Sequence, residues 1–70
     1  MKKKIKIKIN GKINKIDDKT KLSDLIKNLK VPLKKVAIEL NREIVDKKNL
    51  NKISLKLNDK IEIVHFIGGG

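Results

Sequence analysis

The sequence predicts a single α+β domain in which a mixed sheet of four to five strands is covered on one face by one main helix. Three patterns predict it: alternating Lys and Ile near the start, a helical stripe of Leu and Ile in the middle, and a β-branched strand near the end. A chain of 70 residues has room for one modest core. It is too short for an enclosed enzyme cleft, so we expect no catalytic residue in it.

The first predicted element is a β-hairpin. Residues 4–9 alternate Lys and Ile, the period of a strand with one buried face, and Asn10-Gly11 supplies the positive φ angles of a tight turn. A two-residue turn places Ile16 opposite Ile5 on the buried face and points Ile13 the other way. This conflict leaves a longer loop, a bulge or an exposed isoleucine at a sheet edge as possibilities.

An amphipathic helix of about ten residues is predicted next. Its apolar side chains recur at the spacing of one helical stripe and are Leu22, Leu25, Ile26 and Leu29. Thr20 is the expected N-cap, and Pro32 ends the helix at about Lys30. A helix this short does not persist alone, so it must lie on the sheet.

Three further strands are predicted after the helix. They cover residues 36–40, 43–45 and 61–66, with turns at Asn41-Arg42 and Asn58-Asp59 and a polar connection over 46–52.

The last strand has two different faces. Glu62 marks one face as solvent-exposed, and Val64 and Phe66 share that face. These two apolar side chains are therefore the expected partner-docking face beside the C-terminus. The alternative is that Phe66, the only aromatic residue, folds over a sheet edge and extends the core.

The strong positive charge allows two interpretations. The chain carries 19 basic and 8 acidic residues, a formal net charge of +11, which attracts phosphates and acidic proteins. With one arginine, Arg42, and one aromatic, Phe66, base recognition and stacking have almost no side chains to use, so nucleic acid is not the expected partner. We prefer a solvated surface of biased composition that still favours acidic partners.

Several site types are not expected. The sequence has no cysteine and one histidine, His65, so neither a metal site nor a nucleophile–base pair is predicted. Asp17, Asp18 and Asp59 are interpreted as turn residues. We expect neither a signal peptide nor a membrane span, and we expect a cytoplasmic location.

The chain stops at Ile67-Gly68-Gly69-Gly70, directly after the last strand. We therefore divide it into a domain over residues 1–67 and a flexible glycine tail over residues 68–70. Glycine lacks Cβ, so such a tail fits a narrow channel and delivers a carboxylate to another protein's active site. The competing interpretation is a frayed end or an expression remnant.

The α-carboxylate of Gly70 is the only group that the sequence offers for chemistry. It is ionised near neutrality, with a reference pKa of about 3.3 to 3.7, and is a poor electrophile until a partner activates it. Condensation with ATP to an acyl-adenylate creates a leaving group. Displacement by sulfur then leaves a thiocarboxylate, a soft nucleophile on a flexible arm.

The order and content of these segments resemble the ThiS family, the sulfur carriers of thiamine biosynthesis. The resemblance covers nearly the whole chain, and its parts are residues 5–11, 22–26, 36–41, 44–45 and the Ile-Glu-Ile-Val-His-Phe-Ile-Gly-Gly-Gly ending at 61–70. It implies a ubiquitin-like β-grasp fold. The family's essential di-glycine falls on Gly69 and Gly70, and the strongly basic charge departs from the family's more acidic or neutral members.

The resemblance also implies partners. A ThiF-type E1-like enzyme would adenylate Gly70 with ATP, and a cysteine desulfurase relay would supply the sulfur. Thiazole synthase would accept the sulfur from the Gly70 thiocarboxylate, and the carrier itself would hold no cofactor.

Two alternatives remain. One is a related carrier with a di-glycine end, such as the small subunit of molybdopterin synthase or a carrier for tRNA thiolation or cysteine synthesis. The other is a basic interaction module without sulfur chemistry, which would be indifferent to the loss of Gly70.

Overall fold

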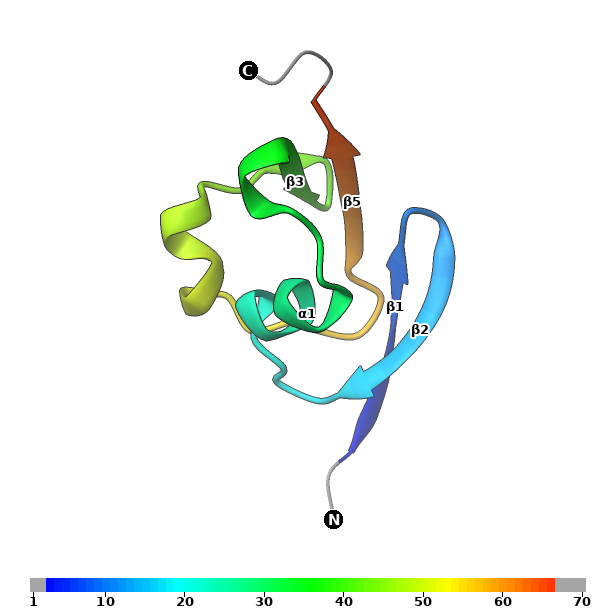
Figure 1. Cartoon of the computed structure of the whole chain (residues 1–70). Coiled ribbons are helices and arrows are strands. Elements are labelled where there is room, and N and C mark those ends of the chain that lie inside the picture. Colours follow the sequence, from blue (N-terminus) through cyan, green and yellow to red (C-terminus); the bar gives the residue numbers. More distant parts are fainter. Residues whose placement is uncertain (1–2, 67–70) are drawn as a thin grey trace.

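A computed structural model describes residues 3–66 of the chain (Figure 1). In this range the elements are β1 (Lys4–Ile9), β2 (Lys12–Asp17), α1 (Leu22–Leu29), the 3-10 helix η1 (Leu33–Lys35), β3 (Val36–Leu40), β4 (Glu43–Ile44), the 3-10 helix η2 (Lys47–Lys52) and β5 (Lys60–His65). The predicted tail, Gly68 to Gly70, lies outside the described residues. The predicted α+β class with one main helix is confirmed.

The strands of the described region form one mixed sheet in the order β2-β1-β5-β3-β4. β1 and β5 run parallel, and the other neighbouring strands are antiparallel. Since parallel neighbours need a long crossover, the intervening chain passes over one face of the sheet, where α1 lies (Figure 1). The last strand thereby reaches the middle of the sheet.

The first hairpin has the predicted two-residue turn. Ile5 is opposite Ile16, and the turn residues Asn10 and Gly11 have φ angles of 48° and 83°. Ile13 is 65% exposed, so the conflict in the pattern is resolved as an exposed isoleucine on the other face of the sheet.

Helix α1 buries the predicted stripe and ends where expected. Leu22, Leu25 and Ile26 are buried, and Lys30 adopts a left-handed conformation with φ of 57° before Pro32. The helix has 8 residues rather than about ten. Leu29, at its end, is 39% exposed, so the buried part of the stripe ends at Ile26.

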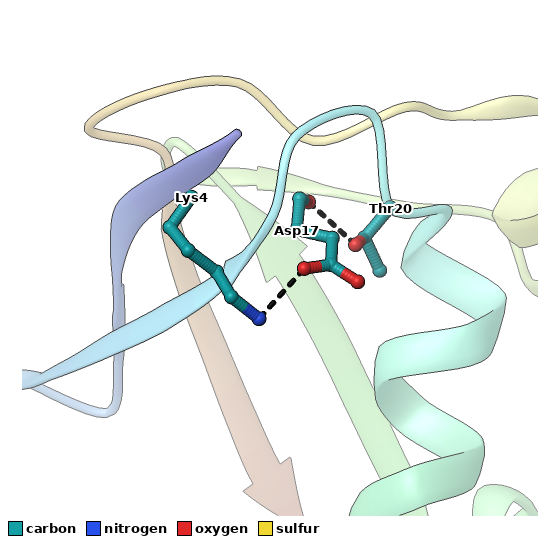
Figure 2. Close-up of polar contacts among 3 residues, drawn as sticks. All are labelled: Lys4, Asp17 and Thr20. Carbon is teal, nitrogen blue, oxygen red and sulfur yellow. Dashed lines mark hydrogen bonds and ion pairs between the residues drawn. The ribbon is translucent and has the colours of Figure 1, made fainter. Parts of the chain in front are cut away.

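The predicted N-cap is wrong. The cap position is Lys21, without a side-chain hydrogen bond, and the Thr20 hydroxyl instead donates to the Asp17 carbonyl over 2.6 Å (Figure 2). Asp17 also forms an ion pair with Lys4, with 2.7 Å between Oδ1 and Nζ. Thr20 lies one residue before the cap position, and its hydroxyl bonds the end of β2 instead of the first turn of the helix.

Two later predictions also need correction. The fourth strand covers residues 43–44 rather than 43–45, although the Val45 amide still donates to the Ile38 carbonyl at 2.8 Å in the register of the β3–β4 pair. The polar connection over residues 46–52 contains η2, whose first turn is capped by the Asp46 carboxylate accepting from the Lys48 amide at 3.0 Å. Leu50 of η2 is buried and anchors it.

The core lies between the helical layer and the inner face of the sheet. Its buried side chains are Ile5, Ile7, Leu22, Leu25, Ile26, Val36, Ile38, Leu50, Leu55, Ile61 and Ile63. No polar side chain is buried within residues 3–66. The interior is thus purely aliphatic, and chemistry has to reside on the surface.

Candidate functional site

Strand β5 is paired with β3 up to its last residue and with β1 only at its start. It pairs with β1 at Lys60 and Ile61 and with β3 along five positions, the last being His65 opposite Val36. The Phe66 amide then donates to the Lys35 carbonyl at 2.8 Å. The backbone is therefore fixed as far as the last described residue before the glycine tail.

Two asparagines at turns add side-chain bonds to β5. The Asn10 carboxamide accepts from the Ile63 amide at 2.8 Å and donates to the Ile63 carbonyl at 3.4 Å. Asn41 accepts from the Lys60 amide at 2.9 Å and donates to the Asp59 carboxylate at 3.0 Å. The sequence predicted both asparagines only as turn residues, because a turn is visible in neighbouring residues. Their side-chain bonds join segments that are distant in the sequence and leave no local pattern.

Val64 and Phe66 are 50% and 49% exposed. Val64 is opposite Ala37 on the face of the sheet away from α1. Phe66 does not join the core, and the Lys47 ammonium lies 5.6 Å from the centre of its ring. This cation–π contact was not predicted, since nothing in the sequence around Lys47 distinguishes it from the other lysines.

The helix-free face of the sheet continues from Val64 toward β4. Ile44, 76% exposed, is opposite Glu39, which is in turn opposite Glu62. On this half of the face the exposed aliphatic residues Val64 and Ile44 therefore flank two carboxylates, those of Glu39 and Glu62. Such a mixed surface is suited to protein contact rather than to binding a small molecule.

The other candidate groups have structural roles or no partners in a site. His65 is exposed at the end of β5, and residues 3–66 contain no cluster of His, Cys, Asp or Glu that could hold a metal. The Asp59 carboxylate accepts from the Lys56 amide at 2.8 Å as well as from Asn41, which confirms its role in the turn. No helix in the described part of the chain is long and apolar enough to span a membrane.

A five-stranded mixed sheet with a central parallel pair and one main helix defines a ubiquitin-like β-grasp protein. A solved structure, the thiamine biosynthesis protein ThiS from Geobacter metallireducens, superposes with a TM-score of 0.82 at 29% identity, over 94% of this chain and all of that one.

The comparison of sequences gives the particular family. The ThiS family profile matches residues 7–70. The sulfur carrier protein ThiS of Bacillus subtilis is 37% identical over 91% of this chain and 98% of its own length. This chain belongs to the ThiS family.

The relatives also include larger proteins. The thiazole synthases of Magnetococcus marinus and Paramagnetospirillum magneticum are 38% and 39% identical over 94% of this chain. The chain spans only 20% of the length of each. A ThiS-like segment is thus found both as a separate protein and within a thiazole synthase.

Proposed function

We propose that this chain is the sulfur carrier of thiazole formation in thiamine biosynthesis and acts through the carboxylate of Gly70. The observation that carries the proposal is the combination of a rigidly held β5, half-exposed Val64 and Phe66 at its end, and a chain that continues into Gly68-Gly69-Gly70. Membership of the ThiS family supports the same function.

The chemistry proceeds in two steps on the terminal carboxylate. An oxygen of the Gly70 carboxylate attacks the α-phosphate of ATP in an E1-like enzyme of the ThiF type, which gives an acyl-adenylate and releases pyrophosphate. A sulfur nucleophile, supplied from cysteine through a desulfurase, then attacks the carbonyl carbon and AMP leaves. Because this sulfur is the outer atom of a cysteine persulfide, the product is an acyl disulfide. A second thiol cleaves its S–S bond, forms a disulfide with the donor cysteine and releases the Gly70 thiocarboxylate.

The thiocarboxylate donates its sulfur to thiazole synthase. The carrier is a cosubstrate and supplies no catalytic side chain, and ATP is bound by the activating partner rather than by this chain. The cytoplasm, where ATP is available, is the proposed location.

The rigid end of the sheet has a function in this scheme. A partner that recognises Val64 and Phe66 finds the start of the tail in a fixed position, because the Phe66 amide is bonded to Lys35. Only the few glycines of the tail then have to become ordered in the partner's channel, which lowers the conformational entropy lost on binding.

The direct test is intact-protein mass spectrometry after incubation with ATP, the E1-like enzyme and a sulfur source. We expect a mass gain equal to the replacement of one oxygen by sulfur, located at Gly70. A chain lacking Gly70 is expected to show no gain, and Gly70→Ala, which keeps a terminal carboxylate, measures the need for an unbranched residue.

The acceptor is tested separately. The thiocarboxylate form is incubated with thiazole synthase and its substrates and, in parallel, with the large subunit of molybdopterin synthase and its substrate, and the return of the carboxylate mass is followed. Discharge only by molybdopterin synthase would replace the thiamine assignment by that of a related carrier. Absence of any mass gain with several active E1-like enzymes would favour the basic interaction module.

A further inference from the structure

The helix-free face of the sheet has a second half, over β1 and β2, that the proposed sulfur chemistry does not use. Lys8 is opposite Ile13 on β2 and opposite Lys60 on β5. Lys6 is opposite Lys15 in the same ladder. The hairpin half of the face is therefore basic, with Ile13 as its exposed apolar residue.

The lysines in this half are placed against one another. Like charges directly opposite each other across a sheet are destabilising, and both Lys6–Lys15 and Lys8–Lys60 are such pairs. Among the described residues, no carboxylate lies within ion-pair distance of Lys6, Lys8 or Lys60. A carboxylate-bearing partner would relieve this repulsion, whereas water and salt only screen it.

The basic half also contains a shallow pocket of about 260 Å³, lined by Lys6, Ile7, Lys8, Ile13, Asn58 and Lys60. The pocket is smaller than the sites of roughly 300 to 1,000 Å³ that enclose drug-sized molecules, but it has room for an aliphatic side chain. Asn58 closes one side of it, because the Asn58 amide donates to the Lys6 carbonyl at 2.8 Å.

We propose that this basic half, Lys6, Lys8 and Lys60 around Ile13, docks a short acidic segment of a partner protein whose single aliphatic side chain enters the Ile13 pocket. The lysines attract the carboxylates of the segment, and the apolar contact with Ile13 fixes the position of the segment along the surface. This docking site is separate from Val64 and Phe66 and does not depend on sulfur transfer.

The charges on the rest of the face determine the length of the segment. Glu62 follows Lys60 by two residues on the same face of β5 and is opposite Glu39 on β3. A polyanion lying across the whole sheet would be repelled by the carboxylates of Glu62 and Glu39. The surface therefore fits a short acidic segment, and phosphate chains have no group that would use the aliphatic pocket.

The test is an NMR titration of the full chain with a short peptide of Asp and Glu residues around one central leucine, at low ionic strength. Backbone amide shifts are expected to saturate and to centre on Lys6, Lys8, Ile13 and Lys60. Neither ATP nor a sulfur source is present, so the outcome is independent of the Gly70 chemistry.

Three variants make the test specific. Ile13→Ser is expected to lower the affinity for the peptide about fivefold through lost apolar contact. Lys8→Glu is expected to lower this affinity about tenfold through charge reversal. Ile44→Ser is the matched control, because Ile44 is an exposed isoleucine on the other half of the same face. It should change the affinity by less than about twofold.

Several results would overturn the proposal. They are equal loss of affinity in Ile13→Ser and Ile44→Ser, equal binding of a peptide with serine in place of leucine, and shifts spread evenly over all surface lysines. Tighter binding of a single-stranded oligonucleotide of equal charge, unaffected by Ile13→Ser, would assign the surface to phosphates instead.

Discussion

Asn10 and Ile63 are 53 residues apart, yet the carboxamide of Asn10 bonds both backbone groups of Ile63. β1 ends at Ile9, and its pairing with β5 reaches only Ile61. The Asn10 side chain continues the hydrogen bonding along β5 after the β1 backbone has turned away, because a carboxamide has the same donor and acceptor as a peptide group. One residue thus makes the hairpin turn and secures the strand that carries the tail.

The first prediction concerns this bond. Asn10→Gly keeps a residue that tolerates φ of 48° but removes the carboxamide. We expect the free energy of unfolding to fall by about 1 to 2 kcal/mol, measured by urea denaturation, and the Ile63 amide to exchange faster with deuterium. Asn58→Gly is the control, because Asn58 has φ of 71° and forms only a backbone bond within the described residues. Equal effects of the two substitutions would contradict a special role for Asn10.

Thr20 provides a second test. Thr20→Val removes the hydroxyl that donates to the Asp17 carbonyl and keeps the shape of the side chain. Stability should fall by about 1 kcal/mol, followed by thermal unfolding, and Thr20→Ser should restore most of the loss. Full stability in Thr20→Val would mean that water replaces the hydroxyl without cost.

The aliphatic core predicts a contrast between two isoleucines. Ile61 is fully buried in β5, whereas Ile44 is 76% exposed. Ile61→Val is expected to lower the free energy of unfolding by about 0.5 to 1.5 kcal/mol, and Ile44→Val should change it by less than about 0.5 kcal/mol. Chemical denaturation of both variants checks the burial assigned to β5.

Lys47 is expected to hold the ring of Phe66. Lys47→Gln removes the cation over the ring and should cost about 0.5 to 1 kcal/mol of stability. The ring proton shifts of Phe66, the only aromatic residue, report the contact directly in NMR spectra. Lys48→Gln is the neighbouring control, and unchanged Phe66 shifts in Lys47→Gln would show that the contact does not form in solution.

The last prediction tests the docking role of Val64. Val64→Asp places a charge on a half-exposed apolar position and should raise the KM of the E1-like enzyme for the carrier by about tenfold or more. The kcat should change less, because the Gly70 carboxylate is unaltered. Asn28→Asp adds the same charge on α1, in the opposite layer, and should leave KM unchanged. Equal KM values in the two variants would remove Val64 from the docking face.

Local patterns explain why much of the fold was predictable. The alternation over residues 4–9 sets the apolar face of the first strand, and Asn10-Gly11 marks the turn. The register stayed open in the sequence because Ile13 and Ile16 lie on opposite faces, and the structure places Ile16 opposite Ile5. The stripe from Leu22 to Leu29 defines the helix face in the same way. Thr20 was misjudged because capping propensity is local, whereas the Asp17 carbonyl that captures its hydroxyl is placed by the end of β2.

The sequence by itself determined which segments form strands and the helix, which face of each is apolar, and that a glycine ending follows the last strand. Only the tertiary structure decided that β5 lies between β1 and β3, that Asn10 and Asn41 bond to it, and that Lys47 lies over Phe66. It also decided that Lys8, Ile13 and Lys60 come together in one patch. The apolar periodicity of a segment shows which face of its strand is buried, because it depends only on residues that are adjacent in the chain. Pairing between strands depends instead on contacts between distant residues, which form only when the common core is packed.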